Sequence, residues 1–315
     1  MNASPVQLRP KDHALWNAFE QSLRGEVVQY FDIRKAVENH VDCVIFPNPK
    51  AHQQFVSELR KLVETLTRSC ISYVLIKTEK RYLYEDSNID IVCQTEEDFQ
   101  KAQDIAACDS RVRTTSFHEP DKEMWRKIEN GNERQPGWHL HRGVTWNGVP
   151  YLTNDSLFQK RRRVSVEGIE FWAPSLEHDL LIHAGHTVFE NFQVTLGEFY
   201  DAALRTQEPL DWEFMHRESE REGWGFAFRL FLSALAGFGA SVPGLISIPN
   251  APTPYRAMIR FPERYPGVFQ LWAFSERIIH NLRHANFGFA FREMYAYPAF
   301  YLIEKFKQFT GIRYP

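Results

Sequence analysis

One short segment restricts the possible fold more than any other part of the chain, because it contains two apolar runs separated by a polar turn. Residues 71–77 (ISYVLIK) are mostly β-branched or aromatic, and residues 88–93 (NIDIVC) alternate between polar and apolar types. Both runs are typical of strands. Successive strand side chains point to opposite faces of a sheet, so Asn88 and Asp90 share one face while the isoleucines beside them face the core.

Helical patterns flank this pair of predicted strands. The apolar residues before it recur at the spacing of one helix face, namely Phe55, Leu59, Leu62, Val63 and Leu66. After it, Thr95 is the expected N-cap of a second helix, with Asp98 at the third helical position. The apolar face of that second helix comprises Phe99, Ala102, Ile105 and Ala106. We therefore expect an α+β fold in which a mixed sheet carries flanking helices.

Further strands are predicted downstream, from less regular patterns. Residues 112–118 indicate a third strand, and residues 138–146 alternate well enough for another. Residues 164–172 (VSVEGIEFW) predict a hairpin that turns at Glu167–Gly168. The polar stretch 125–136 between these strands predicts an irregular loop or a short helix.

The hydrophobic period changes from that of a strand to that of a helix at Pro174–Ser175, where we place a domain boundary. We expect an N-terminal helical segment at 1–50, an α/β domain at 51–173 and a helical C-terminal domain at 174–315. The helices are expected at residues 11–40, 55–66, 96–106, 176–184, 196–203, 212–222, 226–237, 269–284 and 287–309.

The apolar stretch 226–248 requires a separate decision, because its length approaches that of a membrane span. Gly237, Gly239, Pro243 and Gly244 would break a spanning helix. We interpret the stretch as a buried helix that ends near Gly237 and continues as a loop.

Charge and cysteine content narrow the functional classes. A net charge of −3 and a pI near 6.5 create no overall field that would attract nucleic acid. The dense basic run Lys160–Arg163 is typical of the solvated start of a hairpin. The four cysteines are spread out without a CxxC pair, and Met1–Pro10 lacks the apolar core of a signal peptide. These features predict reduced thiols and a cytoplasmic location, and they leave the oligomeric state open.

Two groups of polar residues could carry chemistry. Asn88 and Asp90 present oxygen atoms from one sheet face, and oxygen is the ligand that Mg²⁺ requires. His139 and His141 occupy alternate positions of a predicted strand, so they could share a transition metal ion; two histidines packed in an aromatic-rich sheet are the commoner arrangement. The pair His178–Asp179 is also found in metal-dependent phosphohydrolases, but the further upstream helical histidine of that motif is absent.

The segment YVLIKTEKRYLYEDSNIDIVCQTEEDF resembles the metal-site region of the uncharacterised nucleotidyltransferase family within the DNA polymerase β-like superfamily. Members of that family show a strand ending in Lys-Gly, a loop, and Asp-x-Asp followed by apolar residues. Lys77 matches the lysine and Asp90 matches the second aspartate. A downstream strand of the family reads acidic-x-His, and the tetrapeptide WHLH matches it with His141 in the histidine position.

The helical part of the chain adds to the resemblance, which covers about residues 50–235. The segments FWAPSLEHDLLIHAGHTVFE, LGEFYDAALRT and LDWEFM resemble the family's C-terminal helices. In those helices His183 is the central histidine and Asp201 is the acidic residue of a later helix. The resemblance implies that His183 is an interior residue tying the helical part to the sheet, whereas His186 is predicted to be an ordinary surface residue.

The resemblance implies nucleotidyl transfer. An acceptor hydroxyl attacks the α-phosphate of a nucleoside triphosphate, pyrophosphate leaves, and two Mg²⁺ ions stabilise the transition state. Asp90 and Asn88 would bind metal in that scheme. Lys77 and Thr78 would approach the triphosphate. His139 would replace the carboxylate that activates the acceptor, and a neutral imidazole could accept the proton.

Three positions depart from the family pattern. Thr78 stands where glycine is usual, Asn88 where the first aspartate is usual, and His139 where the third carboxylate is usual. The site would hold one formal negative charge where the family has three, and charge largely decides Mg²⁺ affinity in an oxygen site. We therefore keep a second hypothesis, a catalytically degenerate relative that binds a nucleotide or a partner without turnover. A histidine-metal phosphohydrolase is a third alternative, and the acceptor is not identified.

Overall fold

The computed structural model describes residues 49–79, 88–114, 121–146, 149–191, 201–202, 204–239, 248–249, 266–292 and 294–295. Several sequence predictions fall wholly or partly outside these residues. They are the helix at 11–40, most of the turn between the first two predicted strands, most of the helix at 196–203 and the second half of 287–309.

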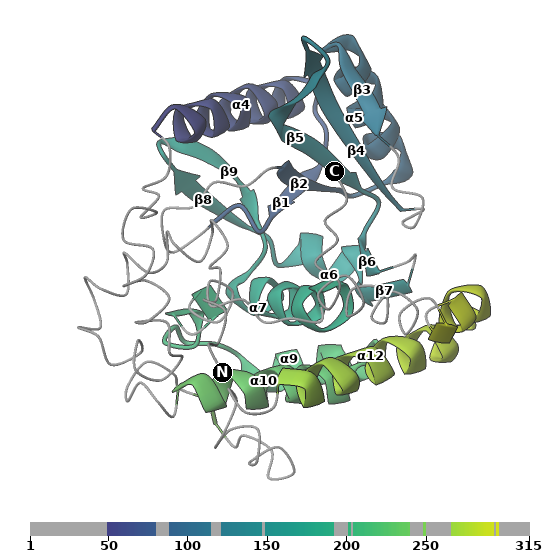
Figure 1. Cartoon of the computed structure of the whole chain (residues 1–315). Coiled ribbons are helices and arrows are strands. Elements are labelled where there is room, and N and C mark those ends of the chain that lie inside the picture. The colour runs from purple at the N-terminus through teal and green to yellow at the C-terminus, as the bar shows by residue number, and fades with distance from the viewer. Residues whose placement is uncertain are drawn as a thin grey trace, which may run out of the picture.

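A five-stranded mixed sheet forms the centre of the α/β part (Figure 1). Its strands are β1 (Tyr73–Ile76), β2 (Asn88–Cys93), β3 (Arg111–Thr114), β4 (Lys122–Glu129) and β5 (Asn132–His141), in the spatial order β1-β2-β5-β4-β3. Strand β2 runs antiparallel to β1 and parallel to β5, and the other pairs are antiparallel. The predicted α+β class with a mixed sheet and flanking helices is confirmed.

The prediction of a loop or short helix at 125–136 is wrong. Strands β4 and β5 form a hairpin there, and its turn lies at Asn130 (φ 53°) and Gly131 (φ 77°). An Asn-Gly pair with two positive φ angles is the favoured two-residue hairpin turn, because its twist matches that of the strands. Strand β4 was not predicted because its buried positions include charged residues. Lys122 and Glu123 are buried, whereas an alternating strand pattern expects apolar side chains at buried positions.

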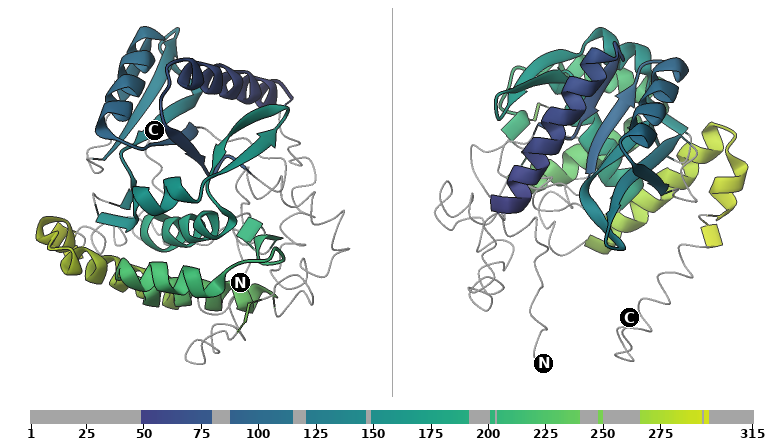
Figure 2. Two further views of the ribbon diagram at one scale, coloured as in Figure 1. Left: turned by 180° about the vertical axis from the view of Figure 1, so that it is seen from behind. Right: turned by 90° about the horizontal axis from the view of Figure 1, so that it is seen from above.

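Two helices cover one face of the sheet. They are α4 (Pro49–Arg68) and α5 (Glu96–Cys108), and both lie on the same side in Figure 1 and in the rear view of Figure 2. Leu59 and Leu62 of α4 and Phe99 of α5 pack with Leu75 and Ile91 of the sheet in one buried cluster. The alternation of β2 predicted this inward face, and the two helix predictions are confirmed.

The remaining helices cover the opposite face. They are α7 (Leu176–Gly185), the π-helix η2 (His186–Asn191), α9 (Trp212–Arg221), α10 (Gly225–Gly239) and α12 (Pro266–Arg283). Figure 1 shows α7 next to the sheet, with α9, α10 and α12 beyond it. Val74 and Val92 of the sheet share a buried cluster with Leu181 of α7 and Phe231 of α10. None of the helices in the described residues is long and apolar enough to cross a membrane.

Two small hairpins and a short helix connect the sheet to these helices. They are β6 (Val144–Trp146) with β7 (Val149–Leu152), α6 (Asn154–Gln159), and β8 (Arg162–Val166) with β9 (Ile169–Ala173). The strand predicted at 138–146 is interrupted, because β5 ends at His141 and β6 begins at Val144. The β8–β9 hairpin turns at Glu167 and Gly168, with φ angles of 50° and 71°, as predicted.

The predicted N-caps are present. The Thr95 side chain accepts from the Asp98 amide at 3.1 Å. Asp211, which the sequence pattern also indicates as the N-cap of the helix expected at 212–222, accepts from the Phe214 amide at 2.9 Å. Ser175 caps α7, so the change of period at 174 coincides with the start of a helix. The division of the chain into three domains stays a prediction.

Candidate functional site

The parallel pairing of β2 with β5 brings three polar side chains together on the sheet face that points toward α7. Asp90 lies opposite His139 in the register, and His141 lies two positions further along the same strand. Asp90 Oδ1 is 2.8 Å from His139 Nδ1 and also 2.8 Å from His141 Nε2. We call these three residues the sheet centre.

The hydrogen bonds fix the protonation pattern of the sheet centre. Burial opposes ionisation of Asp90, but the charge of Lys77 and the bonds from His139 and His141 outweigh it and hold the pKa of Asp90 well below its usual range. An ionised carboxylate only accepts hydrogen bonds, so both imidazoles donate to it. Burial also lowers the pKa of His141 to about 3, so this ring is neutral at pH 7.

The sheet centre is open on one side only. The side chains of Asp90 and His141 are 6% and 2% exposed, whereas that of His139 is 19% exposed. A neutral His139 that donates from Nδ1 has its lone pair on Nε2. The one ring that solvent reaches therefore has a nitrogen able to accept a proton.

The turn after β1 carries the other two predicted binding residues. Lys77 has a left-handed backbone (φ 59°), and its Nζ lies 3.1 Å from His186 Nδ1. The buried Thr78 hydroxyl donates to the carbonyl of Ile76 at 3.2 Å. Lys77 is close enough for its charge to lower the pKa of Asp90, so the turn and the sheet centre belong to one region.

His186 differs from its prediction. It is half-buried beside Lys77 rather than on the surface. Helix α7 ends at Gly185, and His186, which still has helical dihedrals (φ −59°, ψ −43°), is the first residue of the π-helix η2. Helical spacing alone could not show that this side of the helix faces Lys77 of the turn after β1.

Asn88 opens β2, where it pairs with Gly137 and shares a sheet face with Asp90. The structure thus brings Asn88, Asp90 and His139 together on one face, with Lys77 nearby. Asp86, which would share this face if the strand began two residues earlier, lies outside the described residues.

A second group of charged residues joins the helices to the turn after β1. Arg205 forms ion pairs with Asp179 and with Asp201, the latter at 3.1 Å, and His183 Nε2 lies 2.9 Å from Asp201 Oδ2. Arg205 also donates to the carbonyl of Glu79 at 2.6 Å. The predicted role of His183 as an interior residue is confirmed. We call Arg205, Asp179, Asp201 and His183 the arginine network.

The arginine network also includes Asp179, one residue of the His178–Asp179 pair that suggested a metal-dependent phosphohydrolase. Asp179 is used by Arg205, and the two ring nitrogens of His178 face the hydroxyls of Ser156 at 2.9 Å and Ser175 at 3.2 Å. His178–Asp179 is therefore part of the helical packing. Among the described residues, the one group of three metal-ligating side chains is the sheet centre.

Magnesium, which the family resemblance implies, does not suit the residues present. Mg²⁺ requires near-octahedral oxygen coordination, and proteins supply it with carboxylates beside substrate phosphates. Asp90 is the single carboxylate of the centre, and its Oδ1 already accepts from two imidazoles. Asn88 offers only a neutral amide. The donor set that the described residues supply does not fit a two-magnesium centre.

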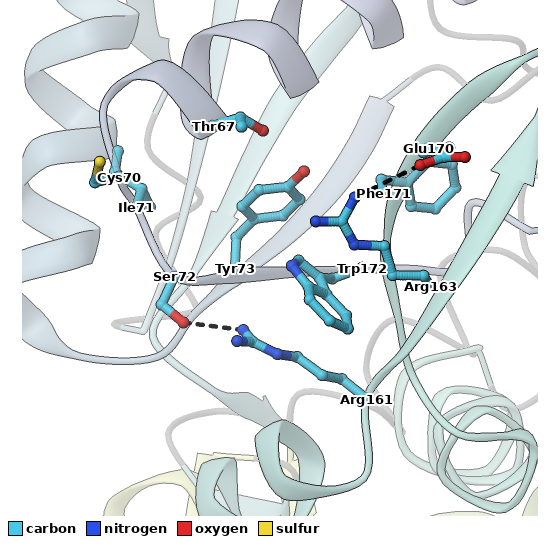
Figure 3. A pocket seen from close by; sticks show the side chains of 10 residues that line it. All are labelled: Thr67, Cys70, Ile71, Ser72, Tyr73, Arg161, Arg163, Glu170, Phe171 and Trp172. Atoms are coloured by element: carbon cyan, nitrogen blue, oxygen red, sulfur yellow. Dashed lines mark hydrogen bonds and ion pairs between the residues drawn. The ribbon is translucent and has the colours of Figure 1, made fainter.

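The basic run forms the start of a hairpin, as predicted, and lines a separate pocket of about 260 Å³ (Figure 3). Arg161 and Arg163 lie over the Trp172 ring, at 4.5 and 4.8 Å from its centroid. Arg161 also donates to Ser72 Oγ at 2.9 Å. Tyr73, which lines this pocket, points to the opposite sheet face from Asp90, so the pocket and the sheet centre are different sites.

Comparisons with known proteins add no relative: no family model, curated protein or solved structure matches the chain. The site is therefore argued from its own residues. The contacts of His141 with Asp90 and of His186 with Lys77 are seen only in the folded structure. His141 had a signal, since it follows His139 at alternate-residue spacing, whereas nothing in the sequence connects His186 with Lys77.

Proposed function

We propose that this chain is a nucleotidyltransferase-like protein that binds a nucleoside triphosphate beside Lys77 and transfers its nucleoside monophosphate to a hydroxyl group. The acceptor is a small molecule or a polymer that the residues do not specify. The observation that carries the proposal is the Asp90–His139 pair, with its 2.8 Å hydrogen bond and one ring edge open to solvent.

The pair supplies what a general base needs. A base must sit where it can reach the proton of the attacking hydroxyl and must be held in the correct tautomer. Asp90 accepts from Nδ1 of His139, which leaves Nε2 as the acceptor and would stabilise the imidazolium after proton transfer. In this role Asp90 orients His139, so the base does not depend on a magnesium ion held by Asp90.

The turn after β1 supports the placement of the triphosphate. Lys77 brings a cation to the edge of the sheet centre, and an ammonium group is a common phosphate ligand. Arg205 donates to the carbonyl of Glu79, and Arg162 forms an ion pair with the Glu79 side chain. Because these two arginines fix the turn, Lys77 loses little conformational entropy when a triphosphate binds.

A specific observation favours a second candidate, nucleotide binding without turnover. The sheet centre has a single carboxylate, and nucleotidyl transfer in the family depends on charge stabilisation by metal ions. A chain that keeps Lys77 but lacks the other carboxylates would still hold a triphosphate. The two candidates share the binding step and differ only in the release of pyrophosphate.

Two linked measurements separate the candidates. Calorimetric titration of the full chain with each of the four common ribonucleoside triphosphates, with and without Mg²⁺ or Mn²⁺, tests binding. A pyrophosphate-release assay with the best ligand tests transfer, using a panel of hydroxyl-bearing acceptors and the protein itself. Release that is lost in His139→Ala but kept in the surface variant His284→Ala supports transfer.

Binding without pyrophosphate release would replace the first candidate with the second. Absence of binding by any triphosphate would remove both. The variant Lys77→Met distinguishes specific binding from general charge attraction, because Lys101→Met removes an equal charge from the exposed face of α5.

A further inference from the structure

We propose that Asp90, His139 and His141 form a binding site for a divalent transition metal ion of the Zn²⁺ class, held by one carboxylate oxygen and two ring nitrogens. This site differs in metal class from the magnesium centre implied by the family resemblance. It concerns the same residues as the proposed function but stands without it, because the metal is tested alone.

The donor atoms fit such an ion. Zn²⁺, Co²⁺ and related ions accept imidazole nitrogen and carboxylate oxygen, and two histidines with one carboxylate are a recurrent set for zinc and iron. The three ligand atoms lie within 4.8 Å of one another. Two ligand atoms of a tetrahedral zinc ion, each at about 2.0–2.1 Å from it, lie roughly 3.4 Å apart, so the widest pair must close by up to about 1.4 Å and the two 2.8 Å pairs must open by about 0.6 Å.

The backbone already holds these ligands in position. Asp90 and His139 face each other across the parallel pair of central strands, and His141 is on the same strand face. The centroids of the His139 and His141 rings lie 4.2 Å apart. Ligands on paired strands lose little freedom when an ion binds, and such sites are more exact than sites built on loops.

Access and charge set the kind of site. His141 and Asp90 are nearly inaccessible, so an ion would enter and keep an open position on the side of His139, as in catalytic zinc sites with three protein ligands. The charges of Lys77 and Lys122 reach the centre and oppose a cation. We therefore expect micromolar rather than nanomolar affinity.

The metal and the proposed base require different tautomers of His139. An ion held through the atoms that now point at Asp90 would take Nδ1 of His139, and its other nitrogen would then carry the proton. A bound ion would thus exclude the tautomer proposed for proton acceptance. If both proposals hold, metal binding suppresses transfer.

The test is titration of the chelator-treated full chain with Zn²⁺ and Co²⁺ by calorimetry, with the visible absorption of Co²⁺ as a report on coordination number. We expect one site that Mg²⁺ in large excess does not occupy. We expect His139→Ala to lower the affinity at least as much as the roughly 10- to 100-fold loss caused by second-shell changes. The exposed His284→Ala should leave it unchanged.

Because His141 is buried, His141→Ala could unfold the chain, so Asp90→Asn and His141→Gln keep the volumes and serve as second variants. Unchanged Zn²⁺ affinity in His139→Ala and Asp90→Asn, with folding intact by circular dichroism, would overturn the proposal. An octahedral Co²⁺ spectrum typical of oxygen ligands alone would overturn it as well. Failure of metal binding leaves the triphosphate titration unaffected, so the two proposals fail independently.

Discussion

The sheet centre and the arginine network each place a histidine nitrogen close to an aspartate oxygen, at 2.8 and 2.9 Å. They differ in what surrounds the pair. In the network, Arg205 is fully buried and neutralises two carboxylates, and His183 is 3% exposed. In the sheet centre no arginine among the described residues contacts Asp90, and His139 is open to solvent.

This difference separates a structural pair from a candidate functional one. A buried ion pair with all its partners inside holds segments together, and removing one partner is costly because a buried charge is left alone. A pair with one ring edge in solvent can bind or exchange a proton with something outside. The following predictions test that division, beginning with the largest effect.

Replacing Arg205 should give the largest loss of stability. Arg205→Met keeps most of the side-chain volume but leaves Asp179 and Asp201 buried without their cation, which should cost about 3–5 kcal/mol. Urea denaturation followed by circular dichroism measures this change. The control Arg217→Met removes an exposed cation that pairs with Glu213 on the surface, and it should leave the transition midpoint unchanged. A midpoint shift no larger in the first variant than in the control would contradict the structural role of the network.

Acid should destabilise the helical side of the molecule through His178. Burial lowers its folded pKa from 6.5 to about 4, so the unfolded state binds the proton more readily between these values. The stability contribution is complete above pH 6.5 and falls by about 3 kcal/mol as the pH drops toward 4. Stability curves of the wild type and His178→Gln from pH 4 to 7 measure it. Identical pH slopes for the two proteins would rule out this assignment, and the exposed His284→Gln serves as the control.

The same isosteric change should have different consequences in the two regions. Asp201→Asn removes a buried charge that faces Arg205 and His183, and we expect a loss of about 2 kcal/mol. Asp90→Asn keeps an Oδ1 that can still accept from both imidazoles, so stability should change by less than about 1 kcal/mol. Metal binding and any transfer activity should nevertheless be lost in Asp90→Asn. Equal stability losses in the two variants would erase the distinction between the regions.

The smallest effect concerns Lys77. Lys77→Met should weaken binding of the best nucleoside triphosphate about tenfold, which corresponds to about 1.4 kcal/mol, while leaving the thermal midpoint close to that of the wild type. Fluorescence or calorimetric titration measures the affinity. An affinity loss of the same size in Lys101→Met would show that Lys77 has no special position.

Local patterns predicted much of the fold. The alternation of residues 88–93 defined β2, and Thr95 marked the start of α5, because a strand period and a capping side chain depend only on neighbours in sequence. Strand β4 was missed because its buried positions include Lys122 and Glu123, whose partners come from elsewhere in the fold. The turn residues Asn130 and Gly131 were the available signal for that hairpin.

The candidate site was predictable only in part. Strand period placed Asn88 and Asp90 on one face, and the family resemblance singled out His139. The register that puts Asp90 opposite His139 depends on which strands pair, and this is decided by packing of the whole sheet. The approach of His186 to Lys77, 109 positions away, depends on how α7 packs against the turn after β1, which no local pattern indicates.

The parallel pairing of β2 with β5 also has a consequence for how the molecule forms. Parallel neighbours require a long crossover, and here Asp90 and His139 are 49 positions apart, with α5, β3 and β4 between them. A nascent chain that has made only β1, β2 and α5 lacks both histidines of the centre. Contacts of such long sequence separation tend to form late in folding. The time at which the sheet centre becomes able to bind a ligand would therefore report when β5 has paired with β2 and the sheet is complete.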